Sequence, residues 1–422
     1  MATLKRYLRS LDPRLTHEVY VLELGVLLNS FGNGVVLPFL IIYLHNVRGI
    51  ALGTAGLIAA TQSFAGLVSG FVAGSLSDRI GPKRVLIASL AVMTVAFGLM
   101  PLIHVAWEAF ALYTVWGLGS GAFWPSQSAL IAALAPPAKR APAYALQRLA
   151  MNLGVAVGGL AAGFVASVAH PGTFTALFLV DCGTFLAYIA VVARIRTPAL
   201  HPERTRGSWA GVIRDRTFVA VTALNATFIA ATLSLMVELL PAFAKNVAHV
   251  DEREVGAIFA VECVGIVVFQ LPMTKAAEGR RRMRLFAAMG VLWAASLLGV
   301  WATGAWTTAT VAFILLAAVG AGFALGECLH ATVHGPLTAD LAPPQLVGRY
   351  LALARISWQV GWIVGPAGGG FLLQHAPLLL WPLAAGINLV AAAGALAIER
   401  RLPAGVRVSP RSGPMEPVPL QG

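Results

Sequence analysis

Long apolar runs separated by short polar segments form the dominant pattern along this chain. A run of about 18 or more apolar residues is long enough to cross a bilayer as a helix. The 422-residue chain contains twelve such runs, so we predict an all-α membrane protein with twelve transmembrane helices. The predicted helices lie near residues 19–44, 51–76, 83–104, 106–134, 141–168, 173–193, 217–243, 254–274, 284–303, 307–333, 347–374 and 377–398.

Composition supports a membrane location for the whole chain. Hydrophobic residues make up 58% of the sequence and charged residues 11%, with a mean hydropathy of +0.78. A soluble protein carries about 25% charged residues, so most of this surface must face lipid. The chain has no H-E-x-x-H motif and no Walker loop, so we expect neither an enzyme nor an ATP-driven pump.

The net charge of +12 would suggest nucleic acid as the partner of a soluble protein, but its placement argues against that. Nearly all basic residues fall in alternate loops and at the two termini. Only Arg48, Lys245 and Arg253 lie on the other side, and Arg148 and Arg355 lie within predicted helices. The positive-inside rule then predicts a multi-pass protein of the cell (inner) membrane with both termini in the cytoplasm.

A polar, basic and proline-containing stretch divides the chain near its middle. We predict a six-helix bundle over residues 1–196, a cytoplasmic linker over 197–216, a second bundle over 217–400, and a disordered tail over 401–422. Sliding Ala135–Phe164 onto Ala342–Phe371 with an offset of 207 gives eleven identities in thirty positions, including Arg148 with Arg355. The two bundles are therefore predicted to be pseudo-symmetric repeats.

A short charged segment follows the second apolar run and reads G-S-L-S-D-R-I-G-P-K-R. Its glycines allow a tight turn and its basic residues anchor it at the membrane face. This string resembles the signature loop of the major facilitator superfamily, which implies a transporter that works by alternating access. The resemblance also implies that the acid of this loop approaches the start of helix 11 near Gly348 and Arg349. The loop residues concerned are Gly74, Asp78, Arg79, Gly81, Lys83 and Arg84.

A second resemblance lies in the eleventh predicted helix, residues 347–374. A G-x-x-x-G-P-x-x-G-G string there is similar to the antiporter motif of that superfamily. Family members carry this motif in helix 5, where this chain has a weaker version without the proline. The alternative is a helix-packing face that has no bearing on the direction of transport. Helix 1, with Gly34 and Pro38, resembles the twelve-helix drug:proton antiporter branch, although the arginine often found in helix 4 is absent. The helix 11 motif consists of Gly361, Gly365, Pro366, Gly369 and Gly370.

Ionisable residues inside apolar spans are functional candidates by default. The superfamily lines its central cavity mainly with helices 1, 4, 7 and 10, which ranks the proton-coupling candidates as Glu327, then Glu238, then Glu23. The alternative for each is a buried acid that bonds to a neighbouring helix. Four further charged residues are candidates for buried pairs with one another: Arg148, Arg355, Asp181 and Glu262. The alternative for the two arginines is that their side chains reach to the membrane interface.

Glu327, His330 and His334 share one helical face and could form a short proton relay. The alternative is that the histidines only pack. Asn33, Trp124 and His330 are possible cavity-lining residues, and we expect no metal site.

These observations together predict a secondary active transporter, with proton-coupled efflux of lipophilic or cationic small molecules as the leading interpretation. The alternative is a proton-coupled nutrient symporter or facilitator for a sugar, an organic acid or a peptide. We expect no cofactor, because the proton gradient supplies the energy. The expected partners are the lipid bilayer, a small-molecule substrate and protons, with no nucleic acid, and the expected functional unit is a monomer.

Overall fold

The structure is a computed structural model, and it describes residues 15–136, 139–196, 209–343 and 346–409. These residues are helical apart from loops and one isolated β-bridge. The all-α fold is therefore confirmed. The elements are α2 (His17–Val36), η1 (Leu37–Phe39), α3 (Leu40–Ile42), η2 (Tyr43–Val47), α4 (Leu52–Ile80), α5 (Pro82–Leu99), η3 (Met100–Leu102), α6 (Ala106–Leu134), α7 (Arg140–Val165), α8 (Gly172–Arg194), α9 (Trp209–Arg214), α10 (Arg216–Phe228), η5 (Ile229–Leu233), η6 (Leu235–Leu239), α11 (Leu240–Asn246), α12 (Glu252–Ala277), α13 (Arg282–Trp306), α14 (Ala309–Leu341), α15 (Val347–His375), α16 (Pro377–Ile398), η7 (Glu399–Arg401) and η8 (Ala404–Val406).

Ten helical segments of the described chain are long and apolar enough to cross a membrane. The other two long helices are α6 and α15, with 29 residues each, which corresponds to about 43 Å and is sufficient for a span. Both carry glycine, serine and proline among their apolar residues, which lowers their hydropathy. The twelve predicted spans thus each correspond to a helical segment.

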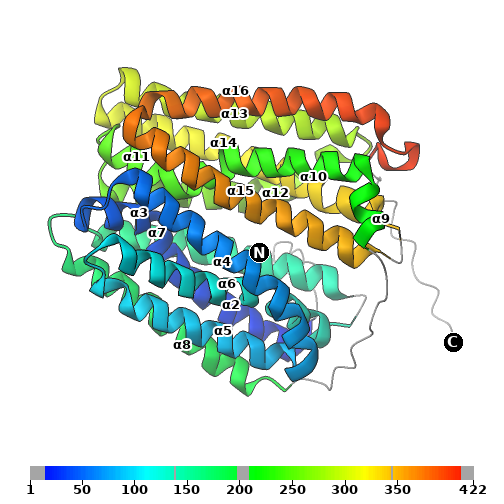
Figure 1. The fold of residues 1–422 in the computed structure, drawn as a ribbon, viewed down its shortest axis with the longest axis horizontal. Helices are drawn as coiled ribbons and strands as arrows, with labels where there is room; N and C mark the ends of the chain where they lie inside the picture. The colour runs from blue at the N-terminus through cyan, green and yellow to red at the C-terminus, as the bar shows by residue number, and fades with distance from the viewer. Residues whose placement is uncertain (1–14, 137–138, 197–208, 344–345, 410–422) are drawn as a thin grey trace, which may run out of the picture.

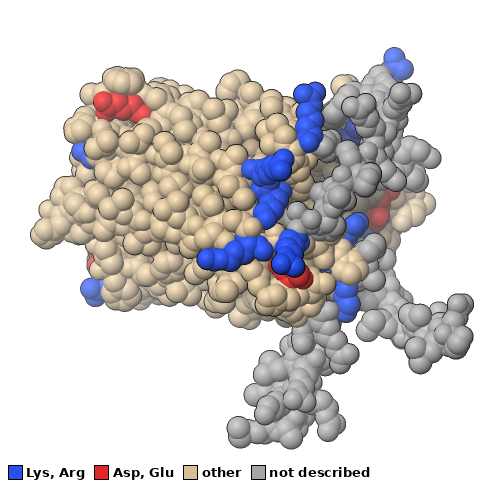
Figure 2. All heavy atoms as spheres, turned by 90° about the horizontal axis from the view of Figure 1, so that it is seen from below, with Lys and Arg blue, Asp and Glu red and all other residues tan. Residues whose placement is uncertain are grey.

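The helices form two bundles that lie side by side (Figure 1). One bundle contains α2 to α8 and the other contains α10 to α16, with α4 packed against α15 and α7 against α12 where the bundles meet. We name the two ends of the molecule after the short helices there: the α11 end, which also holds α3, and the α9 end. Figure 2 shows Lys and Arg side chains gathered toward the α9 end.

Equivalent glycines hold the helices of both bundles together. A Cβ atom added at Gly158 of α7 would lie 2.9 Å from the backbone nitrogen of Val35 in α2. One added at Gly365 of α15 would lie 2.6 Å from the carbonyl oxygen of Ala230 in η5. Backbones approach this closely only where the side chain is a hydrogen atom.

The antiporter-like string, which lies in α15, therefore has two packing faces. Gly361, Gly365 and Gly369 contact η5 and η6 within their own bundle. Gly370 faces the other bundle, since a Cβ atom added there would lie 2.9 Å from the Cα atom of Gly56 in α4. The motif is thus a packing element both within a bundle and between the bundles.

The signature loop is shorter than the sequence suggests. Gly74 lies inside α4 with open space around it, and only Gly81, with a φ of 88°, makes the turn into α5. Lys83 donates to the carbonyl oxygens of Ala193 and Ile195 at 2.8 and 2.7 Å, so it caps the end of α8. The side chains of Asp78 and Gly348 lie outside the part that the structure describes, so their predicted approach stays a prediction.

The structure describes parts of two segments that were predicted to be irregular. The predicted linker contains the short helix α9, whereas residues 197–208 lie outside the described residues. The predicted disordered tail is ordered as far as residue 409, because Leu402 is fully buried and the backbone of 407–409 bonds to that of 279–282. Glu399 strengthens this contact through ion pairs with Arg281 and Arg284 at 2.8 and 3.5 Å. Residues 410–422 lie outside the described chain.

Candidate transport site

An ion pair between membrane-spanning helices joins the two bundles. Arg148 of α7 and Glu327 of α14 approach to 3.9 Å between Nη2 and Oε1. Their side chains are 44% and 20% exposed, so neither is fully enclosed by the protein although both lie within membrane-spanning helices. A charge pair that is accessible and spans two moving parts can serve as a switch.

A second carboxylate belongs to the same cluster. Glu262 lies on α12, which packs along α14, and a Cβ atom added at Gly320 of α14 would lie 3.9 Å from the Cβ atom of Glu262. The charges of Glu262 and Glu327 interact electrostatically, and Glu262 is only 6% exposed. Arg148 pairs with Glu327 alone, and no ion pair to Glu262 is found among the described residues, so one carboxylate of the cluster lacks a cation. The cluster can therefore take up a proton or a cation.

The other candidate acids lie apart from this cluster. Glu238, in the π-helical segment η6, interacts electrostatically with Tyr113 of α6 in the other bundle. Glu23 is buried inside the first bundle between α2 and α8, and neither of its carboxylate oxygens has a hydrogen-bond partner in the described chain. Asp181 of α8 is also buried there and accepts a hydrogen bond from Thr184 at 3.1 Å. Arg148 thus pairs with Glu327 and not with Asp181.

The two histidines point into the second bundle. The Nε2 atom of His330 lies 2.7 Å from the Oδ1 atom of Asn225 in α10, and Asn225 donates to Ser357 of α15 at 2.8 Å. The rings of His330 and His334 stack with centroids 5.1 Å apart and are almost fully buried. His330 is therefore a core residue and does not line a cavity, whereas Asn33 and Trp124 are partly exposed.

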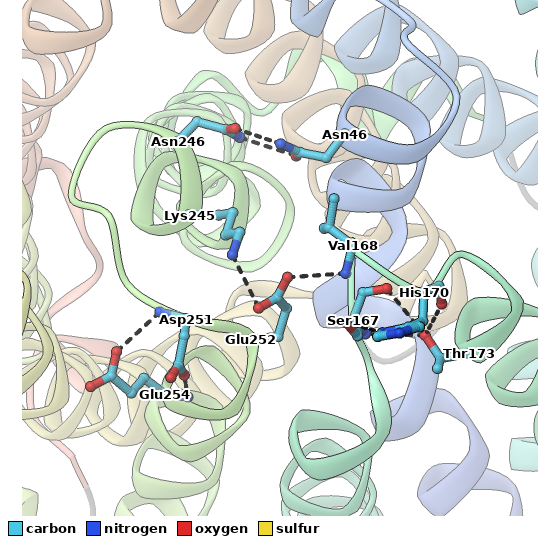
Figure 3. Close-up of polar contacts among 10 residues, drawn as sticks. All are labelled: Asn46, Ser167, Val168, His170, Thr173, Lys245, Asn246, Asp251, Glu252 and Glu254. Carbon is cyan, nitrogen blue, oxygen red and sulfur yellow. Dashed lines mark hydrogen bonds and ion pairs between the residues drawn. The ribbon is translucent and has the colours of Figure 1, made fainter.

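A polar latch, which we define as Asn46, Val168, Lys245, Asn246 and Glu252, closes the α11 end (Figure 3). The Asn46 and Asn246 amides bond to each other in both directions, at 2.6 and 3.2 Å. Glu252 of α12 accepts the Val168 amide of the other bundle at 3.2 Å and pairs with Lys245 at 3.0 Å. The bundles are thus tied together at this end.

Local structure fixes the position of Glu252 and Val168. Asp251 caps α12 by accepting the Glu254 amide at 2.8 Å, and the Glu254 carboxylate accepts the Asp251 amide at 3.0 Å. On the opposite side, the Thr173 hydroxyl accepts the Ser167 amide at 3.1 Å and holds the turn that presents Val168 (Figure 3). The D-x-x-E capping pattern at 251–254 was a signal in the sequence for a helix start. The pairing of Asn46 with Asn246 had none.

An apolar groove lies elsewhere on the described surface. It has a volume of about 360 Å³ and an almost entirely apolar lining from α10, η5, η6, α15 and α16, including Ala226, Val364 and Ile387. The charged cluster is not part of it.

Comparisons with known proteins agree with this geometry. The model of the Major Facilitator Superfamily matches residues 22–326 and 222–422. The chain is 24% identical over 375 residues to the uncharacterized MFS-type transporter YhjO of Bacillus subtilis (strain 168), covering 86% of this chain and 88% of the relative. It is 24% identical over 377 residues to the multidrug resistance protein MdtH of Escherichia coli (strain K12 / DH10B), covering 86% and 89%.

Solved structures share the fold at low identity. A POT family transporter in complex with 5-aminolevulinic acid superposes with a TM-score of 0.77 at 12% identity, covering 91% of this chain and 96% of that one. A bacterial homolog of the human lysosomal transporter Spinster gives 0.70 at 14% identity, covering 93% and 98%. The relatives and neighbours are transporters, not enzymes. With its two six-helix bundles and a family match along nearly its whole length, this chain is a multi-pass membrane transporter that belongs to the major facilitator superfamily.

Proposed function

We propose that this protein is a secondary active transporter that exports lipophilic small molecules, cationic ones included, in exchange for protons. The observation that carries the proposal is the cluster of Arg148, Glu262 and Glu327, which combines an ion pair between the bundles with a carboxylate in excess. The likeness to a multidrug resistance protein at 24% identity supports the class of substrate.

The ion pair offers a physical route from proton binding to movement. When Glu327 is charged, its attraction to Arg148 holds α14 to α7, with a strength of the order of 1 to 4 kcal/mol at this separation. Protonation removes that attraction and frees the bundles to reorient. A cationic solute competes with the proton for the same carboxylates. Because the solute and the proton bind in turn, they cross the membrane in opposite directions.

We assign the α9 end to the cytoplasm. The gathering of Lys and Arg at that end supports this orientation (Figure 2). The proposal includes cytoplasmic locations for both termini. The latch then closes the outer side. In this assignment Glu327 is the first proton carrier, Glu262 assists it, Glu238 serves nearer the outer side, and Glu23 stays inside its bundle as a structural acid.

Proteoliposomes with an imposed pH gradient and the cationic dye ethidium test the proposal. We expect dye movement against the proton gradient, reduced at least tenfold in Glu327→Gln, and unchanged in Glu18→Gln, which alters an acid in the first turn of α2. Wild-type transport rates in Glu327→Gln would refute the assigned carrier. Movement of a sugar or a peptide together with protons would establish the symporter alternative.

A further inference from the structure

Arg355 occupies the place in the second bundle that Arg148 occupies in the first. The two arginines are 207 residues apart in the repeat, and the packing follows the same register. A Cβ atom added at Gly117 would lie 2.8 Å from the Cβ atom of Ala65, and one added at Gly265 would lie 2.9 Å from that of Ala324. Position 117 is therefore equivalent to position 324, which follows 207 residues later. In the helices that they contact, position 65 is equivalent to position 265, which follows 200 residues later.

In this register, no acid stands at the equivalent positions around the second arginine. The position equivalent to Glu327 is Ser120, and the position equivalent to Glu262 is Gln62. These two neutral side chains lie together, because Gln62 donates to the Ser120 hydroxyl at 2.8 Å.

Arg355 belongs to α15, the helix that packs against α4 beside this neutral site. It lies one turn from Gln359, on the same helical face, and Gln359 donates to the carbonyl oxygen of Ser63 at 3.2 Å. A Cβ atom added at Gly66 would lie 3.2 Å from Gln359 Nε2 and 3.7 Å from Ser120 Oγ, so the side chains converge there. The Arg355 side chain is exposed, and no acid among the described residues pairs with it.

An unpaired guanidinium inside a membrane protein is expensive to maintain without a function. Its fork of N–H donors matches the two oxygens of a carboxylate better than a lysine ammonium does. The two halves of the repeat thus carry opposite charges at equivalent sites. Excess negative charge lies at Glu262 and Glu327, and an unpaired positive charge lies at Arg355.

We propose that Arg355 binds a carboxylate of the transported molecule, so that the substrates include lipophilic zwitterions whose cationic end lies toward the acid cluster. This inference rests on the proposed function for its role in transport, but binding itself needs no gradient. A matched pair of probes isolates the carboxylate: rhodamine B carries it beside a delocalised cation, and rhodamine B ethyl ester carries the cation alone.

Equilibrium binding of both dyes to the full-length protein in nanodiscs is the test, read by fluorescence anisotropy. We expect wild-type protein to bind rhodamine B more tightly than the ester. Arg355→Gln should weaken the binding of rhodamine B, relative to that of the ester, by about tenfold or more. Arg355→Lys should restore part of this affinity. Ser120→Glu should act like Arg355→Gln, because it returns the acid that the repeat lacks. Arg214→Gln, which removes an exposed arginine of α9, should leave the ratio of the two affinities unchanged.

Equal loss of both dyes in Arg355→Gln and Ser120→Glu would overturn the proposal and assign Arg355 to packing. Wild-type protein that does not prefer rhodamine B would overturn it as well. Failure of gradient-driven ethidium transport, with the dye preference intact, would refute the proposed function and leave this site standing.

Discussion

The two bundles share their packing and differ in their chemistry. Gly158 of α7 and Gly365 of α15 occupy equivalent positions, and both let a neighbouring helix approach backbone to backbone. Nearly three turns away from these glycines lie the two equivalent arginines. Arg148 pairs with Glu327, whereas neutral Ser120 and Gln62 occupy the positions equivalent to the two acids in the case of Arg355. The glycine positions are limited by steric contact in both bundles. The polar positions carry no such limit and have diverged.

The largest expected effect tests the shared packing. Gly365→Ala should destabilise the protein by about 1–3 kcal/mol, because the new methyl group would overlap Ser234 and lie 2.6 Å from the carbonyl oxygen of Ala230. Gly368→Ala in the same helix is the matched control, since no atom lies within 4 Å of its added Cβ. Thermal unfolding in detergent measures both. Equal stability of the two variants would contradict the packing described here.

The same experiment on the first bundle sharpens the comparison. Gly158→Ala should destabilise about as much as Gly365→Ala, because its Cβ would lie 2.9 Å from the Val35 nitrogen and closer still to the Phe31 carbonyl oxygen. A neutral Gly158→Ala beside a harmful Gly365→Ala would show that the two bundles are not packed alike.

A middle-sized effect concerns the latch, which holds the bundles at the α11 end. Glu252→Ala removes both the acceptor for the Val168 amide and the partner of Lys245. We expect amide hydrogen exchange around residues 165–173 to become roughly tenfold faster. Glu108→Ala is the control, because Glu108 accepts only from amides next to its own helix, at His104 and Val105. Unchanged exchange in Glu252→Ala would mean that Glu252 does not hold the latch.

The smallest effect concerns a contact found in the second bundle. Glu399→Gln weakens the ion pairs with Arg281 and Arg284, and should lower the free energy of unfolding by only about 0.2–1 kcal/mol, since both arginines are largely exposed. Thermal unfolding at low and high salt measures it, and the difference between variant and wild type should shrink in salt. A loss of several kcal/mol would show that the ordered tail is a core element.

The sequence was sufficient for the helices and the repeat, because both depend on patterns within a segment. Apolar runs located every membrane-spanning segment, and the aligned arginines located the two equivalent positions. The contact of Arg148 with Glu327 could not be predicted, since it depends on how helices nearly 180 residues apart are rotated toward each other. His330 looked like a cavity residue for the same reason: its spacing places it on a face, but packing decides what that face meets.

The ordered tail and the latch were missed for a different reason. Two apolar residues, Leu402 and Val406, anchor a segment whose prolines suggested disorder. Asn46 and Asn246 lie 200 residues apart at helix ends, where polar residues are ordinary. Neither case leaves a pattern that composition or periodicity can detect.

The close approach of Gly56 to Gly370 sets where the molecule can bend. It lies in the first two turns of α4, so most of that 29-residue helix extends beyond it toward the α9 end. The added Cβ of Gly163 lies 3.1 Å from the Arg253 carbonyl oxygen, which makes a second tight contact near the same end. Two contacts of this kind define an axis of rotation. Because the axis lies near the α11 end, that end is closer to it than the α9 end is. A small rotation about it would part the α11 end by little and displace the α9 end by much more.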